Sequence, residues 1–257
     1  MDTLQQCFSF IDLTTLNATD TEARGRLFAQ NVNRFAEDYP RMPHVAAICV
    51  YPALIGAVRE TLKVKGVRIA AVGAGFPASQ TFTQIKEREC SLCVEHGADE
   101  VDVVLSLNFF FAGQYDRVAA ELRGIRKAMG PDAHLKVILE TGALKTEENI
   151  RKASFLAMEN GADFIKTSTG KMEPAATPFA ATVMCKCIAE YFKQTGRRVG
   201  FKPAGGIVTS AEALEYHSIV KDILGEQWLT PSLFRIGASR LANNLLKDIL
   251  SQDVAYF

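Results

Sequence analysis

The chain has 257 residues, of which 48% are hydrophobic and 23% charged, so it can bury a large core. Its 29 basic and 29 acidic residues balance, which argues against a nucleic-acid-binding or membrane-surface role. No apolar run approaches the roughly 18 residues of a membrane span, and the N-terminus lacks the basic region of a signal peptide. We therefore expect a cytoplasmic protein that binds neither nucleic acid nor membrane.

The cysteine and histidine residues do not suggest a metal site. The six cysteines fit a reducing compartment as free thiols. Cys90 and Cys93 have a C-x-x-C spacing, but they lie in a helical pattern and no second pair accompanies them. The four histidines are scattered, with no spacing that would place two of them on one helix face. The sequence therefore predicts no bound metal.

Short apolar runs alternate with helical patterns along the whole chain. The first expected strand, 10–16, ends in polar groups that include Asp12 and Thr14, and a helical pattern then begins at Thr19 and Asp20 and continues to 38. In chain order, the further strands are expected at 45–51, 67–72, 100–105, 135–140, 164–166, 199–202 and 234–239. The helices that follow them are expected at 53–63, 83–96, 115–129, 147–160, 179–193, from 209 onward and at 241–249.

These elements make eight strands, each followed by a helix. Several strands are continuous apolar runs, as is usual for parallel strands covered on both faces. Two of them follow the same Gly-Ala-Asp turn, at 97–99 and 161–163, which indicates a repeated unit. The sequence predicts a single α/β domain over residues 1–257, a (β/α)8 TIM barrel, with a doubly wound open sheet as the alternative.

Functional groups of such a barrel lie at the carboxyl ends of its strands. The residues expected there are Asp12, Cys49, Asp102, Lys136, Lys166 and Lys202. An unpaired buried charge is prohibitive, so we expect the charged members of this set to pair with one another in the barrel mouth. The alternative is a set of paired core charges without a catalytic role.

Lys166 and Lys202 each end a strand and each precede a glycine-containing turn. A free lysine has a pKa near 10.4 and is almost fully protonated at neutral pH. Burial and a second ammonium close by lower that pKa and free the amine to attack a carbonyl. Spacing alone does not decide which lysine is the nucleophile. Asp102 is the best-placed carboxylate to move protons once an iminium has formed.

Glycine-containing turns follow the last three expected strands. Their residues are Thr169, Gly170 and Lys171, then Gly205 and Gly206, then Gly237 and Ser239. Glycine lets backbone N–H groups approach an anion, and barrels often bind phosphate at their last loops. One such turn is an ordinary connection between a strand and a helix, but three in succession predict a phosphate site.

Nearly the whole chain resembles the 2-deoxyribose-5-phosphate aldolases, a family of class I aldolases that use a lysine Schiff base in a (β/α) barrel. The segments that carry the resemblance are 12–17, 47–52, 97–104, 135–142, 150–153, 161–171 and 200–206. The resemblance implies that Lys166 is the Schiff-base nucleophile, Lys202 the ammonium that perturbs it and Asp102 the carboxylate that relays protons. It further implies phosphate binding by Gly170, Lys171, Gly205, Gly206, Gly237 and Ser239.

The implied reaction is the reversible cleavage of 2-deoxy-D-ribose 5-phosphate to D-glyceraldehyde 3-phosphate and acetaldehyde. The iminium serves as the electron sink, so no metal or organic cofactor is expected. The expected partners are a small phosphorylated sugar and acetaldehyde. The sequence does not determine the oligomeric state, and a homodimer is our hypothesis.

Two departures from the family pattern concern the site. Arg240 stands where the family has a small hydroxyl residue, and it should tighten anion binding if it faces the phosphate. A tyrosine that ends the chain in some relatives and is thought to assist proton transfer is penultimate here, so Tyr256 is a candidate helper. We also expect Cys49 to react with concentrated aldehyde if it lies near the mouth of the barrel. The sequence is equally compatible with Cys49 as a small apolar residue of the core.

Two other functions remain open at this point. The same lysines could serve a transaldolase-like aldolase acting on another sugar phosphate. A barrel could also bind a sugar phosphate without catalysis, because a fold does not determine a function. The presence of Lys166, Lys202 and Asp102 together argues against this second reading.

Overall fold

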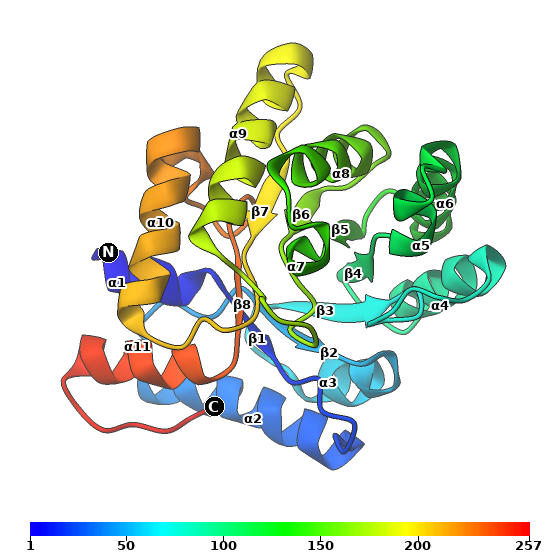
Figure 1. The fold of residues 1–257 in the computed structure, drawn as a ribbon. Helices are drawn as coiled ribbons and strands as arrows, with labels where there is room; N and C mark the ends of the chain where they lie inside the picture. Colours follow the sequence, from blue (N-terminus) through cyan, green and yellow to red (C-terminus); the bar gives the residue numbers. More distant parts are fainter.

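The computed structural model describes all 257 residues, and its centre is a sheet of eight parallel strands (Figure 1). In chain order they are β1 (Ile11–Thr14), β2 (Ala47–Val50), β3 (Arg68–Gly73), β4 (Glu100–Val104), β5 (His134–Ile138), β6 (Phe164–Lys166), β7 (Gly200–Lys202) and β8 (Ile236–Ala238). They pair in the spatial order β7-β6-β5-β4-β3-β2-β1-β8. Two isolated parallel bridges, Phe201 with Phe234 and Ala204 with Gly237, then join the two edges. The predicted barrel is confirmed, and the open sheet is excluded because its edges meet.

Helices surround the strands, one following each of them (Figure 1). The main helices are α2 (Glu22–Asp38), α3 (Ile55–Thr61), α4 (Thr83–Glu95), α6 (Tyr115–Met129), α8 (Glu147–Glu159), α9 (Pro178–Thr195), α10 (Ser210–Leu224) and α11 (Arg240–Leu250). Shorter ones are α1 (Thr3–Ser9), α5 (Leu107–Phe111), α7 (Thr141–Leu144) and the 3-10 turns η1 (Pro52–Leu54) and η2 (Glu226–Trp228). None of the helices combines the length and the apolar character needed to cross a membrane.

Capping side chains stabilise the starts of several helices. Thr209 and Glu212 form a capping box at α10, and the hydroxyl of Thr177 accepts from the backbone of Ala180 at α9. The predicted start of α2 is wrong by two residues, because Thr21 is the cap. Asp20 instead accepts hydrogen bonds from the Thr15 hydroxyl (2.7 Å) and from the backbone N–H of Asn17, and so shapes the loop after β1.

The strand expected at 135–140 ends earlier, at Ile138. Glu140 has φ +55°, a left-handed conformation that cannot continue a strand, and α7 begins directly after it. Its buried carboxylate accepts from the backbone N–H (3.2 Å) and the hydroxyl (2.5 Å) of Thr169. The hydrogen bonds of Glu140 therefore connect the segment after β5 to the loop after β6.

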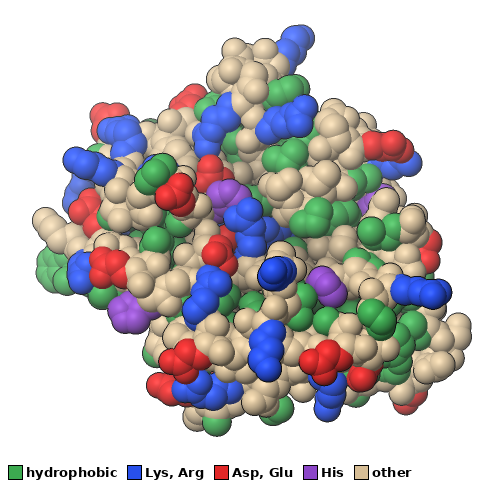
Figure 2. Space-filling view, turned by 180° about the vertical axis from the view of Figure 1, so that it is seen from behind, with side chains coloured by type: hydrophobic (Ala, Val, Ile, Leu, Met, Phe, Trp, Pro, Cys, Tyr) green, Lys and Arg blue, Asp and Glu red, His purple; other side chains and the backbone are tan.

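Apolar side chains fill the space between the strands and the helices, in one core cluster of 64 buried residues. The interior of the barrel is different, because charged side chains occupy much of it. All six cysteines are free and buried, including Cys90 and Cys93 on α4. On the face turned away from the view of Figure 1, acidic and basic side chains are intermixed (Figure 2). That face offers no large area of a single charge.

Candidate active site

A cavity of about 410 Å³ opens at the carboxyl ends of the strands, among the loops after β1, β6, β7 and β8. Ten of the residues singled out in the sequence line it: Thr14, Lys166, Thr169, Gly170, Lys171, Gly205, Gly206, Gly237, Ser239 and Arg240. Ten others were not expected: Thr15, Leu16, Asn17, Arg24, Phe28, Ala204, Ile207, Val208, Ala238 and Phe257. The three successive glycine-containing turns do meet around one space, as the sequence pattern indicates.

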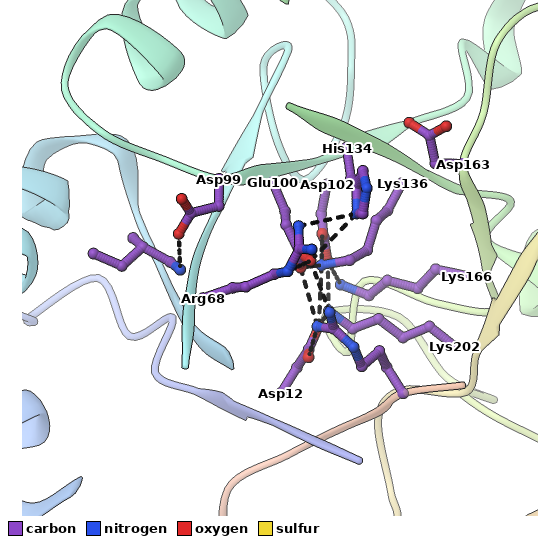
Figure 3. A network of polar contacts seen from close by, with 12 residues as sticks. Asp12, Arg68, Asp99, Glu100, Asp102, His134, Lys136, Asp163, Lys166 and Lys202 are labelled. Atoms are coloured by element: carbon purple, nitrogen blue, oxygen red, sulfur yellow. Dashed lines mark hydrogen bonds and ion pairs between the residues drawn. The ribbon is translucent and has the colours of Figure 1, made fainter. Parts of the chain in front are cut away.

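Lys166 reaches this cavity from the end of β6 and is only 3% exposed. Its Cα pairs with that of Lys202 in the register of β6 and β7. Both lysine Nζ atoms lie 2.8 Å from the same oxygen, Oδ2 of Asp102 on β4 (Figure 3). The two nitrogens are therefore separated by no more than twice 2.8 Å, or 5.6 Å.

The pKa values of the two lysines move in opposite directions. Burial lowers the pKa of Lys166, and the neighbouring Lys202 ammonium adds to this effect against the opposing pull of Asp102. Burial also disfavours a charged Lys202, but Asp102 and Asp12 outweigh it and raise the pKa of that lysine. Lys202 is 2.5 Å from Asp12 and 2.8 Å from Asp102, whereas Lys166 contacts Asp102 alone. The difference in carboxylate contacts, which spacing in the sequence does not contain, thus favours the free amine at Lys166 over that at Lys202.

The charged residues expected to cluster do lie together beneath the cavity (Figure 3). Lys136 lies 3.1 Å from Asp12 and 3.2 Å from Asp102, and none of these three side chains is exposed. The carboxyl pKa of Asp102 is held well below its ordinary value, because the three lysines outweigh the effect of burial. Asp12, Asp102, Lys136 and Lys202 do not line the cavity, and Lys166 is the member of the cluster that does.

Two members of this cluster were not expected from the sequence. Glu100 on β4 and Arg235, just before β8, form a two-pronged ion pair with distances of 2.7 and 3.0 Å. Arg235 also donates to Asp12 at 2.6 Å. Glu100 could have been found, because it lies two residues before Asp102 and alternate strand residues share a face. Arg235 has a weaker signal, a single charge between Phe234 and Ile236.

The rim of the cavity is made by loop backbone. Gly170, Gly205 and Gly206 all have positive φ values, between 75° and 85°, which glycine adopts without strain. A Cβ atom on Gly205 would lie 2.7 Å from Ala175, and one on Gly237 would lie 2.8 Å from Ala204. Close packing of the loops therefore requires glycine at positions 205 and 237.

The N-terminus of α11 also borders the cavity, at Ser239 and Arg240. No side chain caps the free N–H groups at this end of the helix. A helix N-terminus carries partial positive charge, so a cation in its first turn is unfavourable unless an anion binds nearby. Arg240 and the uncapped N–H groups together make this end of the cavity suited to an anion.

Two further expected residues, Tyr256 and Cys49, also lie outside the cavity. Tyr256 donates a hydrogen bond to Asp38 at 2.6 Å, and the terminal Phe257 lines the cavity in its place. Cys49 is fully buried in a small cluster with Leu16, Ala47, Ala70 and Val72. Burial raises the pKa of its thiol, which disfavours the reactive thiolate.

Comparisons with known proteins match the chain to one family of aldolases. Residues 8–224 match the model of the DeoC/LacD family of aldolases. The chain is 44% identical to the human deoxyribose-phosphate aldolase and 43% identical to that of the mouse, over 96% of this chain and 80% of each relative. A solved structure described as the unique tetrameric structure of deoxyribose phosphate aldolase from Aeropyrum pernix is 25% identical. It superposes with a TM-score of 0.74 over 98% of this chain and 94% of that one.

Proposed function

The chain belongs to the DeoC/LacD family of aldolases, and from this premise we propose that it reversibly cleaves 2-deoxy-D-ribose 5-phosphate to D-glyceraldehyde 3-phosphate and acetaldehyde. The observation that carries the proposal is that Lys166 is the single amine of the buried charged cluster that lines the cavity. Its depressed pKa gives it a larger share of free amine than an ordinary lysine. The names of the human and mouse relatives support the choice of substrate.

In the first step the Lys166 amine attacks the aldehyde carbon of the open-chain sugar. The carbinolamine that forms loses water and becomes an iminium, which withdraws electrons from the adjacent carbon. Asp102 contacts both lysines at 2.8 Å, so it can pass protons between Lys202 and the nitrogen or oxygen at the reacting centre. Because the pKa of Asp102 is strongly lowered, its carboxylate is charged at rest and accepts hydrogen bonds from both lysines. A proton that it takes up is therefore passed on again.

In the second step the bond between C2 and C3 breaks. The C3 hydroxyl gives up its proton and becomes the aldehyde of glyceraldehyde 3-phosphate, while the bonding electrons move onto C2 to form an enamine on Lys166. Protonation of C2 and hydrolysis of the resulting iminium release acetaldehyde and restore the lysine. The reverse sequence joins the two aldehydes.

The 5-phosphate would lie at the rim. The loops of Gly170, Gly205 and Gly206 and the N-terminus of α11 offer backbone N–H groups with little side-chain obstruction. Lys171 and Arg240 add positive charge on the lining of the same cavity. With the phosphate at the rim, the aldehyde end of the sugar would face Lys166.

Reductive trapping tests the proposal. Purified protein is mixed with acetaldehyde and borohydride, and its peptides are analysed by mass spectrometry. We expect a two-carbon adduct on Lys166 that is absent from Lys166→Met, while Lys86→Met, which removes another buried lysine, keeps it. An adduct on Lys202 would exchange the roles of the two lysines. No adduct on either lysine, in folded protein, would contradict the Schiff-base mechanism.

Product analysis separates this reaction from that of a transaldolase-like enzyme. Incubation of the wild-type protein with 2-deoxy-D-ribose 5-phosphate should release acetaldehyde in step with glyceraldehyde 3-phosphate. A barrel that only binds sugar phosphates would release neither. Turnover of another sugar phosphate without acetaldehyde would favour the transaldolase-like reading.

We also propose a cellular compartment and an oligomeric state for the protein. Six free, buried thiols are suited to the reducing cytoplasm, where we place it. We further propose a homodimer, since the side chains of Phe82, Ile85 and Phe111 are each more than half exposed and could be covered by a second copy. Light scattering of the purified protein measures the oligomeric state directly, and a monomer at micromolar concentration would refute the dimer.

A further inference from the structure

The buried charges beneath the cavity have an uneven distribution of partners. The cluster consists of seven side chains that are each at most 3% exposed: Asp12, Glu100, Asp102, Lys136, Lys166, Lys202 and Arg235. Three are carboxylates and four are bases, so the cluster is neutral only when one base has lost its proton. A net buried charge is costly, because little solvent screens it.

The pattern of contacts identifies which base loses the proton. Arg235 contacts two carboxylates, Asp12 and Glu100, and Lys202 contacts Asp12 and Asp102. Lys136 contacts all three carboxylates. Lys166 contacts only one of them, Asp102, and it is the member that reaches the cavity. The other three bases thus take up most of the carboxylate charge, and Lys166 is the base most easily deprotonated.

Arg235 has a particular place in this balance. Its guanidinium occupies one oxygen of Asp12 and both oxygens of Glu100, so less carboxylate charge remains for the lysines above it. Arginine keeps its proton at any ordinary pH, and a fork-shaped pair with a carboxylate fixes its position. It is a permanent cation at the base of the cluster.

We propose that Arg235 is a positioning residue for the aldolase reaction: by completing the charge balance with Asp12 and Glu100, it keeps Lys166 in the neutral amine form. The inference rests on the proposed role of Lys166 as the nucleophile. It adds a residue that touches neither the cavity nor Lys166, and whose influence passes through Asp12 and the lysines of β5 and β7.

Three further side chains that can carry charge lie near the cluster, on β2, β3 and β5. Cys49 on β2 is buried, with a raised pKa that keeps it neutral. Arg68 on β3 and His134 on β5 lie 3.6 Å from Glu100, but their side chains are 38% and 30% exposed. Solvent screens such charges, so they contribute less to the balance than the fully buried Arg235.

The proposal predicts opposite effects for two changes within one ion pair. Arg235→Met removes a cation, so Lys166 should gain a proton and its amine pKa should rise by about one unit. Glu100→Gln removes an anion and should lower that pKa by a similar amount. The double variant Arg235→Met/Glu100→Gln restores the balance and should return to the wild-type value. General loosening of the structure would not produce opposite signs or such a recovery.

The measurement is the pH dependence of Lys166 acetylation by acetic anhydride, followed by peptide mass spectrometry. It reports the free amine whether or not the protein is an aldolase. The rising limb of kcat/KM against pH, which reflects the free enzyme, should shift in parallel. Arg235→Lys keeps the charge and should stay near wild type. Lys86→Met is the matched control, because it breaks an equally buried pair with Glu121, 2.9 Å long, outside the cluster.

An acetylation midpoint in Arg235→Met within about 0.3 units of wild type would overturn the proposal, as would a shift of equal size in Lys86→Met. If Arg235→Met does not fold, Glu100→Gln decides alone, and an unchanged or more alkaline midpoint would overturn it. Absence of a trapped adduct on both Lys166 and Lys202 of the wild-type protein would instead reject the proposed function. The midpoints would still establish whether the charge balance exists.

Discussion

The site combines two regions that are built by different means. The cluster beneath the cavity consists of almost completely buried side chains on β1, β4, β5, β6 and β7, which strand register fixes, and of Arg235 just before β8. The rim consists of loop backbone with glycines at positive φ, and its cations, Lys171 and Arg240, are partly or fully exposed. We propose a division of functions between them: the strands set the protonation of one amine, whereas the loops leave space and N–H groups for an anion.

Lys166→Met breaks the chemistry and should have the largest effect. We expect kcat/KM to fall by at least about 10³-fold, because no other amine of the cluster reaches the cavity. The stability of the fold should stay the same or increase, since the remaining six buried charges balance. Chemical denaturation measures it, and a loss of stability comparable to that of Lys202→Met would contradict the charge balance.

Lys202→Met removes a cation that the cluster needs. We expect a fall in kcat/KM of roughly 10²-fold at neutral pH, with a partial recovery at alkaline pH, because Lys166 then holds its proton more tightly. Stability should fall by about 3 kcal/mol, because Asp12 and Asp102 each lose a buried partner and Lys166 has to take up a proton to restore the balance. The two lysines would thus differ in the sign of their effect on stability, although both are needed for activity.

Acid should weaken the cluster before it affects the rim. The lysines and Arg235 outweigh burial and lower the pKa of Asp12 to about 2, compared with about 3.9 in an unfolded chain. A lowered carboxyl pKa contributes stability above the unfolded value, and that contribution is lost as the pH falls from about 4 to about 2. Thermal unfolding across this range should show a steeper loss in the wild type than in Asp12→Asn. If the melting temperatures of the wild type and Asp12→Asn fell in parallel with pH, the acid sensitivity would not come from Asp12.

Gly205→Val tests the rim without touching the cluster. A Cβ atom there would meet Ala175 at 2.7 Å and Gly170 at 3.2 Å, and the backbone has φ +85°. We expect KM for the phosphorylated sugar to rise by about tenfold or more, while trapping of acetaldehyde on Lys166 changes little. Gly196→Val is the matched control, because that glycine also has a positive φ (+71°) but no neighbour within 4 Å. An equal rise in KM in Gly196→Val would show that the effect does not depend on the position of Gly205 at the rim.

Arg240→Ser should have the smallest effect. The side chain is exposed and lines the cavity, so it should contribute a screened attraction to the phosphate. We expect KM to rise by roughly threefold to tenfold at low salt, with kcat nearly unchanged and a smaller difference at high salt. Cleavage of unphosphorylated 2-deoxyribose should be unaffected. A matching loss with that substrate would show that Arg240 acts on something other than the phosphate.

The sequence determined the barrel, the strand-end residues and the glycine-containing turns, because each leaves a local pattern in neighbouring residues. An apolar run followed by Lys166 or Lys202 predicts a strand and the charge at its end, and alternation along β4 places Glu100 beside Asp102. The resemblance of these segments to known aldolases depends on the same short stretches.

Only the tertiary structure decided how these pieces act on one another. Arg235 meets Glu100 across 135 residues of chain, and closure of the barrel brings it to Asp12, 223 residues away. The difference between the two lysines arises in the same way, since Asp12 reaches Lys202 but not Lys166. Local patterns depend on the nearest few residues, whereas a buried charge responds to every partner that folding brings within a few ångströms.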